Sequence, residues 1–139
     1  MAQTCRMKTE ASLEALENVR DFVAQAAAKF GLPADAVEDL KVAVDEAATN
    51  IVLHGYAGAE GEIEIVVEGH NGSVVLTLVD NAPAFDMEAT HGSDLTEPLE
   101  TRSIGGMGVH LMRALTDSLS HEAPPGGGNR ITMVKNIPA

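Results

Sequence analysis

The chain has 139 residues, the length of one ordinary globular domain, so we expect a single domain over residues 1–139. It carries 9 Lys and Arg against 21 Asp and Glu, a formal net charge of −12. A surface this acidic repels nucleic-acid phosphates and anionic lipid headgroups, so neither nucleic acid nor a membrane is an expected partner. The hydrophobic content of 45% argues against a disordered chain.

The single cysteine, Cys5, cannot form an intrachain disulfide. The sequence shows neither a signal-peptide pattern nor an apolar run long enough to cross a bilayer. These features predict a cytoplasmic protein.

Two amphipathic helices are predicted in the first half of the chain. The first runs from Ser12 to Phe30, with apolar residues at steps of three and four. The second begins near Asp35, which with Glu38 resembles a capping box, and continues to about Tyr56. Its apolar stripe comprises Leu40, Val44, Ala47 and Ile51.

A β-hairpin is predicted after these helices. Residues 62–68 alternate between acidic and apolar side chains, and a β-rich run follows at 74–79, separated by the hairpin signal Asn71-Gly72. With these two residues as the turn, paired positions sum to 143 and Ile63 faces Asp80. Asp80 is therefore expected on the apolar, core-facing side. A further edge strand is possible at residues 3–9.

A long loop or lid is predicted over about residues 81–104, because this stretch has Pro, Gly and acidic residues but no sustained period. A third helix then carries Val109, Met112, Leu115 and Leu119, and a Pro-Gly turn at 124–128 precedes a last strand at 130–137. This order predicts an α/β fold of the α+β kind: a two-layer sandwich with a mixed, mostly antiparallel sheet and three helices on one face.

Glu46, Asn50 and His54 are spaced four apart on the second helix, along a ridge distinct from its apolar stripe. An amide oxygen is a suitable Mg²⁺ ligand, and a nearby carboxylate can accept a proton. Taken alone, however, the spacing fits a solvated helix stripe better.

The sequence supports two interpretations of Asp80 about equally. A carboxylate on the buried side of a sheet requires a partner, and the exocyclic amine of adenine would be one. Alternatively, Asp80 starts the turn that follows by bonding to its own backbone.

The run Gly105-Gly106-Met107-Gly108 opens the third helix, where unpaired N–H groups can bind phosphate oxygens. Tight packing of a helix start is the commoner explanation of such glycines. Arg102 could meet a phosphate, although an Arg at such a position is more often a surface residue.

In this order, three motifs resemble the N, G1 and G2 boxes of the GHKL (Bergerat) ATP-binding fold. They are the helix segment 45–56, the strand ending in Asp80 with Phe85 after it, and the glycine run up to Val109. The chain is most similar to the small anti-sigma-factor serine/threonine kinases of bacteria. This resemblance covers nearly the whole chain, including Asn18-Val19-Arg20 on the first helix.

The resemblance implies that Asn50 holds Mg²⁺ between the phosphates of ATP, that Glu46 is the general base, and that Asp80 receives the adenine amino group. The expected nucleotide-binding residues are Asn50, Asp80, Ala82, Arg102, Gly105, Gly106, Met107, Gly108 and Val109. Such kinases phosphorylate a serine of an antagonist protein, sequester a sigma factor and usually form homodimers. Arg20 is an expected partner contact.

One position departs from the family pattern. The G1 box prefers glycine two residues after the aspartate, where this chain has Ala82. If the position requires positive φ or close approach to the base, the added methyl weakens nucleotide binding. An alternative is therefore a binding module of the same fold that acts through protein–protein contacts with weak or no catalysis. A detached sensor-kinase ATPase domain is disfavoured, because no helix pair with a phosphorylatable histidine precedes these motifs.

Overall fold

The computed structural model describes residues 3–83 and 104–138, and within them five strands form one sheet. The strand order is β1-β2-β3-β5-β4, and each pairing is antiparallel. The predicted mixed, mostly antiparallel sheet is therefore antiparallel throughout its described strands. The strands are β1 (Gln3–Glu10), β2 (Glu62–His70), β3 (Ser73–Asp80), β4 (Ser118–Glu122) and β5 (Asn129–Asn136).

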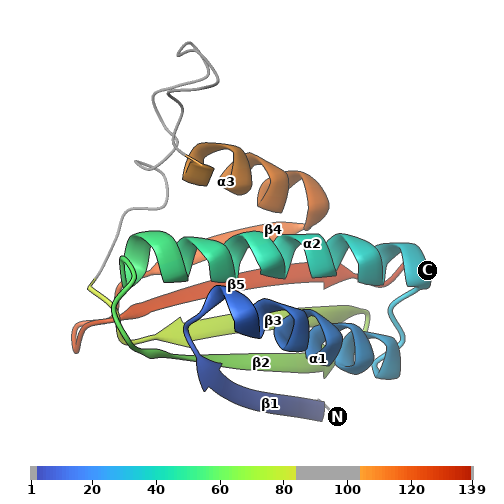
Figure 1. Ribbon diagram of the computed structural model, residues 1–139. Helices are drawn as coiled ribbons and strands as arrows, with labels where there is room; N and C mark the ends of the chain where they lie inside the picture. Colours follow the sequence, from blue (N-terminus) through green and yellow to red (C-terminus); the bar gives the residue numbers. More distant parts are fainter. Residues whose placement is uncertain (1–2, 84–103, 139) are drawn as a thin grey trace.

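Three helices cover one face of this sheet, as the sequence predicts (Figure 1). They are α1 (Leu16–Lys29), α2 (Ala34–Asn50) and α3 (Ile104–Leu115). A short 3₁₀ turn, η1 (Leu13–Ala15), precedes α1, and one π-helical turn, η2 (Ile51–Gly55), extends α2. The core lies between the helices and the inner side of the sheet, and it includes Val23, Leu40, Val44, Ile65, Leu76 and Met133.

The predicted hairpin is confirmed in its register. Ile63 pairs with Asp80 and Val67 with Leu76, so β2 and β3 bury alternate residues as the alternation requires. Gly72 in the turn has a φ of +90°, which a residue with a Cβ rarely adopts. The edge strand expected at residues 3–9 is also present, as β1.

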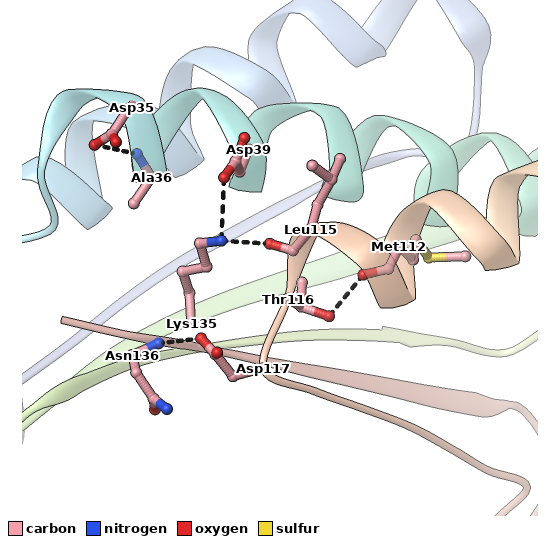
Figure 2. A network of polar contacts seen from close by, with 9 residues as sticks. All are labelled: Asp35, Ala36, Asp39, Met112, Leu115, Thr116, Asp117, Lys135 and Asn136. Carbon is pink, nitrogen blue, oxygen red and sulfur yellow. Dashed lines mark hydrogen bonds and ion pairs between the residues drawn. The ribbon is translucent and has the colours of Figure 1, made fainter. Parts of the chain in front are cut away.

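The predicted capping box at Asp35 is wrong. α2 begins one residue earlier, after Pro33, which has extended backbone and makes no side-chain cap. Asp35 instead lies in the first turn, where one of its oxygens accepts the Ala36 N–H at 3.0 Å (Figure 2). A carboxylate in this position is still favourable, because the N-terminal end of a helix is electropositive.

The third helix ends earlier than predicted. Leu119 lies in β4, and α3 stops at Leu115, whose carbonyl oxygen accepts a hydrogen bond from Lys135 Nζ at 2.7 Å (Figure 2). The spacing from Leu115 to Leu119 fits a helix, but the chain turns after Thr116, whose hydroxyl donates to the Met112 carbonyl. β4, a strand of only five residues, was therefore not predicted from the sequence.

Candidate nucleotide-binding site

Several of the expected site residues belong to elements that meet at one end of the sheet. Figure 1 shows the end of α2 in green, the end of β3 in yellow and the start of β5 at the same end of the molecule. α3 packs against α2 and runs in the opposite direction, so it begins at this end. The α2 terminus, the β3 terminus and the glycine-rich helix start are thereby brought to one region.

Tyr56 ties the end of α2 and η2 to the sheet. Its hydroxyl donates to the Glu62 carbonyl oxygen at 2.6 Å and accepts the Asn81 N–H at 3.0 Å. Gly61 is needed beside it, because a Cβ at that position would overlap the Tyr56 ring. Asn81, which follows Asp80, is therefore hydrogen-bonded directly to Tyr56, which follows η2.

The turn predicted at Asp80 is confirmed, and its contact with adenine stays a prediction. Asp80 is 3% exposed, and its Oδ1 accepts the Ala82 N–H and the Asn129 side-chain amide, each at 2.9 Å. The bond to Ala82 is the predicted turn. Its Oδ2, in contrast, is buried and has no hydrogen-bond partner among residues 3–83 and 104–138. One oxygen builds the turn and the other is available to a ligand.

Burial raises the pKa of Asp80 above its ordinary value, because desolvation disfavours the charged form. Hydrogen bonds from the Asn129 side chain and the Ala82 and Asn129 backbone, together with the nearby His121, oppose this rise. A hydrogen-bond donor to Oδ2 would likewise lower the pKa of Asp80, because it would stabilise the ionised carboxylate.

Asn129 is a site residue that sequence analysis missed. It is fully buried at the start of β5, directly opposite Asp80 in the sheet register. Its neighbour Gly128 has a φ of +86°, and a Cβ there would overlap the Asp80 carbonyl oxygen. An Asn after a glycine-rich turn looks like part of the turn, and only the pairing of β3 with β5 reveals its role.

The ridge of Glu46, Asn50 and His54 is not simply a solvated stripe. Asn50 is 3% exposed, and its Nδ2 has no hydrogen-bond partner within the described ranges. The Nε2 atom of His54 is likewise buried and unpartnered among these residues. Unused hydrogen-bonding capacity in buried groups is costly in an empty site, which favours a polar ligand here.

Glu46 lies half-buried on the same ridge. Burial raises the pKa of its carboxyl group, and the negative charge of Asp45 raises it further. A carboxylate with a raised pKa is a better proton acceptor, which suits the predicted general base. Asp45 is in turn paired with Arg20 of α1, the two side chains lying 2.6 Å apart. The partner contact expected of Arg20 stays a prediction.

Ala82 is 1% exposed. Among the described non-glycine residues only Ala57 has a positive φ, so Ala82 needs no glycine-like backbone. Positive φ is therefore not a reason for glycine at this position. The nucleotide contact expected of Ala82 stays a prediction.

The glycine run lies in the first turns of α3, since that helix begins at Ile104, and Val109 is fully buried. The predicted phosphate contacts of Gly105, Gly106, Met107, Gly108 and Val109 stay predictions. Phe85, Arg102 and most of the lid predicted over 81–104 lie outside the described residues.

The sequence matches the histidine kinase-like ATPase domain family over residues 9–135. The chain belongs to this family. It is also 32% identical over 117 residues to serine-protein kinases RsbW of Bacillus cereus (strain AH820) and Bacillus anthracis, covering 81% of this chain and 73% of the relative. The same figures hold for the RsbW kinase of Bacillus thuringiensis (strain Al Hakam). The resemblance to the GHKL anti-sigma kinases is thereby confirmed.

A solved structure has the same fold as this ATPase-family chain. It contains the RsbU and RsbW domains of Rv1364c from Mycobacterium tuberculosis, and superposes with a TM-score of 0.66 at 19% identity. The match covers 99% of this chain and 34% of that one, so the chain spans about a third of the solved protein's length. Among the described helices of this family member, none is long and apolar enough to cross a membrane.

Proposed function

We propose that this protein is a Mg²⁺- and ATP-dependent serine/threonine kinase that regulates a partner protein. The observation that carries the proposal is the unused hydrogen-bonding capacity of two buried polar side chains, Asn50 and Asp80, at one end of an ATPase-family fold. Asp80 Oδ2 is an acceptor for an exocyclic amine such as that of adenine. The similarity to serine-protein kinases supports phosphoryl transfer to a serine as the reaction.

The residues present fit a Mg²⁺ ion that would bind together with the nucleotide. Asn50 would hold it through its amide oxygen, a neutral ligand of the kind that suffices when phosphates supply further oxygens. When bound, the ion would neutralise charge on the phosphates. Glu46 would accept the proton of the attacking serine hydroxyl, and Asp80 would orient the base. The N-terminal end of α3 would supply backbone N–H groups to the phosphates.

The proposed partners follow the family resemblance: a sigma factor that is sequestered and an antagonist protein that is phosphorylated. We expect a homodimer in the cytoplasm. The alternative is a module that binds these partners without catalysing transfer.

The proposal is tested in two steps with the full chain. Calorimetry with ATP and Mg²⁺ should give saturable binding to the wild type and to Glu46→Gln. The antagonist, identified by co-purification from the native cell, should then receive labelled γ-phosphate from the wild type but not from Glu46→Gln. Undetectable binding at millimolar ATP would refute the nucleotide site, whereas binding without transfer would establish the non-catalytic module.

A further inference from the structure

The side-chain amide of Asn129 has only one orientation that satisfies its surroundings. Its Nδ2 group donates to Asp80 Oδ1 at 2.9 Å and to the Pro83 carbonyl oxygen at 3.2 Å. A flipped amide would place Oδ1 against a carboxylate and a carbonyl, neither of which can donate. Oδ1 must therefore face the other way, toward the ring of His121.

The orientation of this amide also determines that the Nε2 atom of His121 is a hydrogen-bond donor. His121 Nε2 lies 2.9 Å from Asn129 Oδ1, which can only accept, so Nε2 carries the proton and donates. A directed series of hydrogen bonds therefore runs from His121 on β4, through Asn129 on β5, to Asp80 at the end of β3. Each residue comes from a different strand of the sheet.

This series saturates one oxygen of Asp80 and leaves the other unused. Oδ1 is held by Asn129 and by the Ala82 N–H, while the buried Oδ2 has no partner within residues 3–83 and 104–138. We propose that Asn129 and His121 are positioning residues that hold Asp80 with Oδ2 directed to the base, and thereby select a 6-aminopurine over a 6-oxopurine nucleotide. This inference rests on the proposed function.

The nucleotide selectivity depends on whether the Asp80 carboxyl group is ionised or protonated. Burial favours its neutral form, which Asn129 and His121 oppose. Held and ionised, the carboxylate only accepts hydrogen bonds, which matches the amine of adenine. Without these two residues, a protonated Asp80 could donate to the carbonyl oxygen of guanine. The ratio of the two affinities therefore reports the orientation and charge of Asp80 separately from general folding.

The test is calorimetric titration of ATP and of GTP, each with Mg²⁺, into the full chain. Wild type should prefer ATP, and Asn129→Ala should lower the ATP-to-GTP affinity ratio by about tenfold or more, the effect of losing a hydrogen bond to a charged group. His121→Phe should lower it about threefold, and His121→Gln, whose amide can still donate, should recover most of the loss. Ser120→Ala, at an exposed residue of the same strand, is the matched control and should leave the ratio unchanged.

Two results would overturn the inference. The first is an unchanged ratio in Asn129→Ala and His121→Phe while Asp80→Asn still weakens ATP binding, which would leave the nucleotide site standing. The second is an equal loss of both nucleotides, the mark of a purely structural role. If Asn129→Ala does not fold, the two His121 variants decide the matter. A wild type that binds no ATP would refute the proposed function together with this inference.

Discussion

The polar groups near the two ends of α2 differ in whether their hydrogen-bonding capacity is used. At one end, Lys135 Nζ donates to Asp39 at 3.1 Å and to the Leu115 carbonyl, and Asp117 accepts the Asn136 N–H at 2.7 Å (Figure 2). None of these groups is left without a partner. At the other end, Asn50 Nδ2 and Asp80 Oδ2 are buried without one in the described part of the chain.

The difference separates structural polar groups from groups suited to binding. Lys135 fastens α3 and α2 to β5, and its side chain is 16% exposed, so the satisfied network contributes to folding. Unsatisfied buried atoms oppose folding unless a ligand completes them. We therefore expect substitutions at the first end to change stability and substitutions at the second to change nucleotide binding.

The largest expected effect is that of Asp80→Asn. An amide at this position presents a donor or a weaker acceptor to the adenine amine, so ATP affinity should fall roughly 100-fold. Asp117→Asn is the matched control, since it makes the same chemical change at an exposed position of the other network. Calorimetric dissociation constants check this, and a similar loss in both variants would contradict the comparison.

The next largest effect is on the free energy of unfolding, which should respond to substitution of Lys135 but not of Asn50. Lys135→Met should lower the free energy of unfolding by about 1–2 kcal/mol, a range that allows for the 42% exposure of Asp39. ATP affinity should stay as in the wild type.

Asn50→Leu provides the contrast to Lys135→Met. It replaces a buried amide with an unpartnered nitrogen by an apolar side chain of similar size, so the unfolding free energy should change by less than about 1 kcal/mol. Mg²⁺-dependent ATP binding should nevertheless weaken, by less than in Asp80→Asn. Urea denaturation with parallel nucleotide titration distinguishes the two; a large destabilisation by Asn50→Leu would mean that Asn50 is structural.

A smaller effect is expected for Ala82→Gly. Because Ala82 has no positive φ and its side chain is buried, glycine should cost about 0.5–1 kcal/mol through the entropy of the unfolded chain. Ala57→Gly is an informative control, since Ala57 has a φ of +52° and glycine there should be neutral or stabilising. A marked gain in ATP affinity in Ala82→Gly would show that the methyl obstructs the base.

The smallest effect is a shift in the pH dependence of phosphoryl transfer. Glu46 must be ionised to accept a proton, so the rate should fall as pH drops through its raised pKa. Asp45→Asn removes a neighbouring negative charge that raises the pKa of Glu46, and should move this limb to lower pH. Arg20→Gln leaves Asp45 uncompensated and should move it to higher pH. Shifts of equal sign in the two variants would contradict this electrostatic account.

Much of the fold was predictable because its signals are local. The alternation in residues 62–68 and the Asn71-Gly72 turn fix the register that places Asp80 on the core side, and the structure confirms both. The start of α2 and the end of α3 were misplaced, because Pro33 and the contact of Lys135 with Leu115 decide these boundaries. The second of these contacts joins residues 20 positions apart in the chain.

The sequence by itself determined the family, the helix bearing Glu46 and Asn50 and the inward side of Asp80, since each depends on motifs or periodicities of neighbouring residues. Only the tertiary structure decided that Asp80 keeps one oxygen unused and that Asn129 and His121 support the other. The physical reason is that hydrogen-bond satisfaction is a property of strand pairing. β5 pairs with β3, and β4 with β5, only after the chain has passed through α3, and no local pattern records which side chains then lie opposite one another.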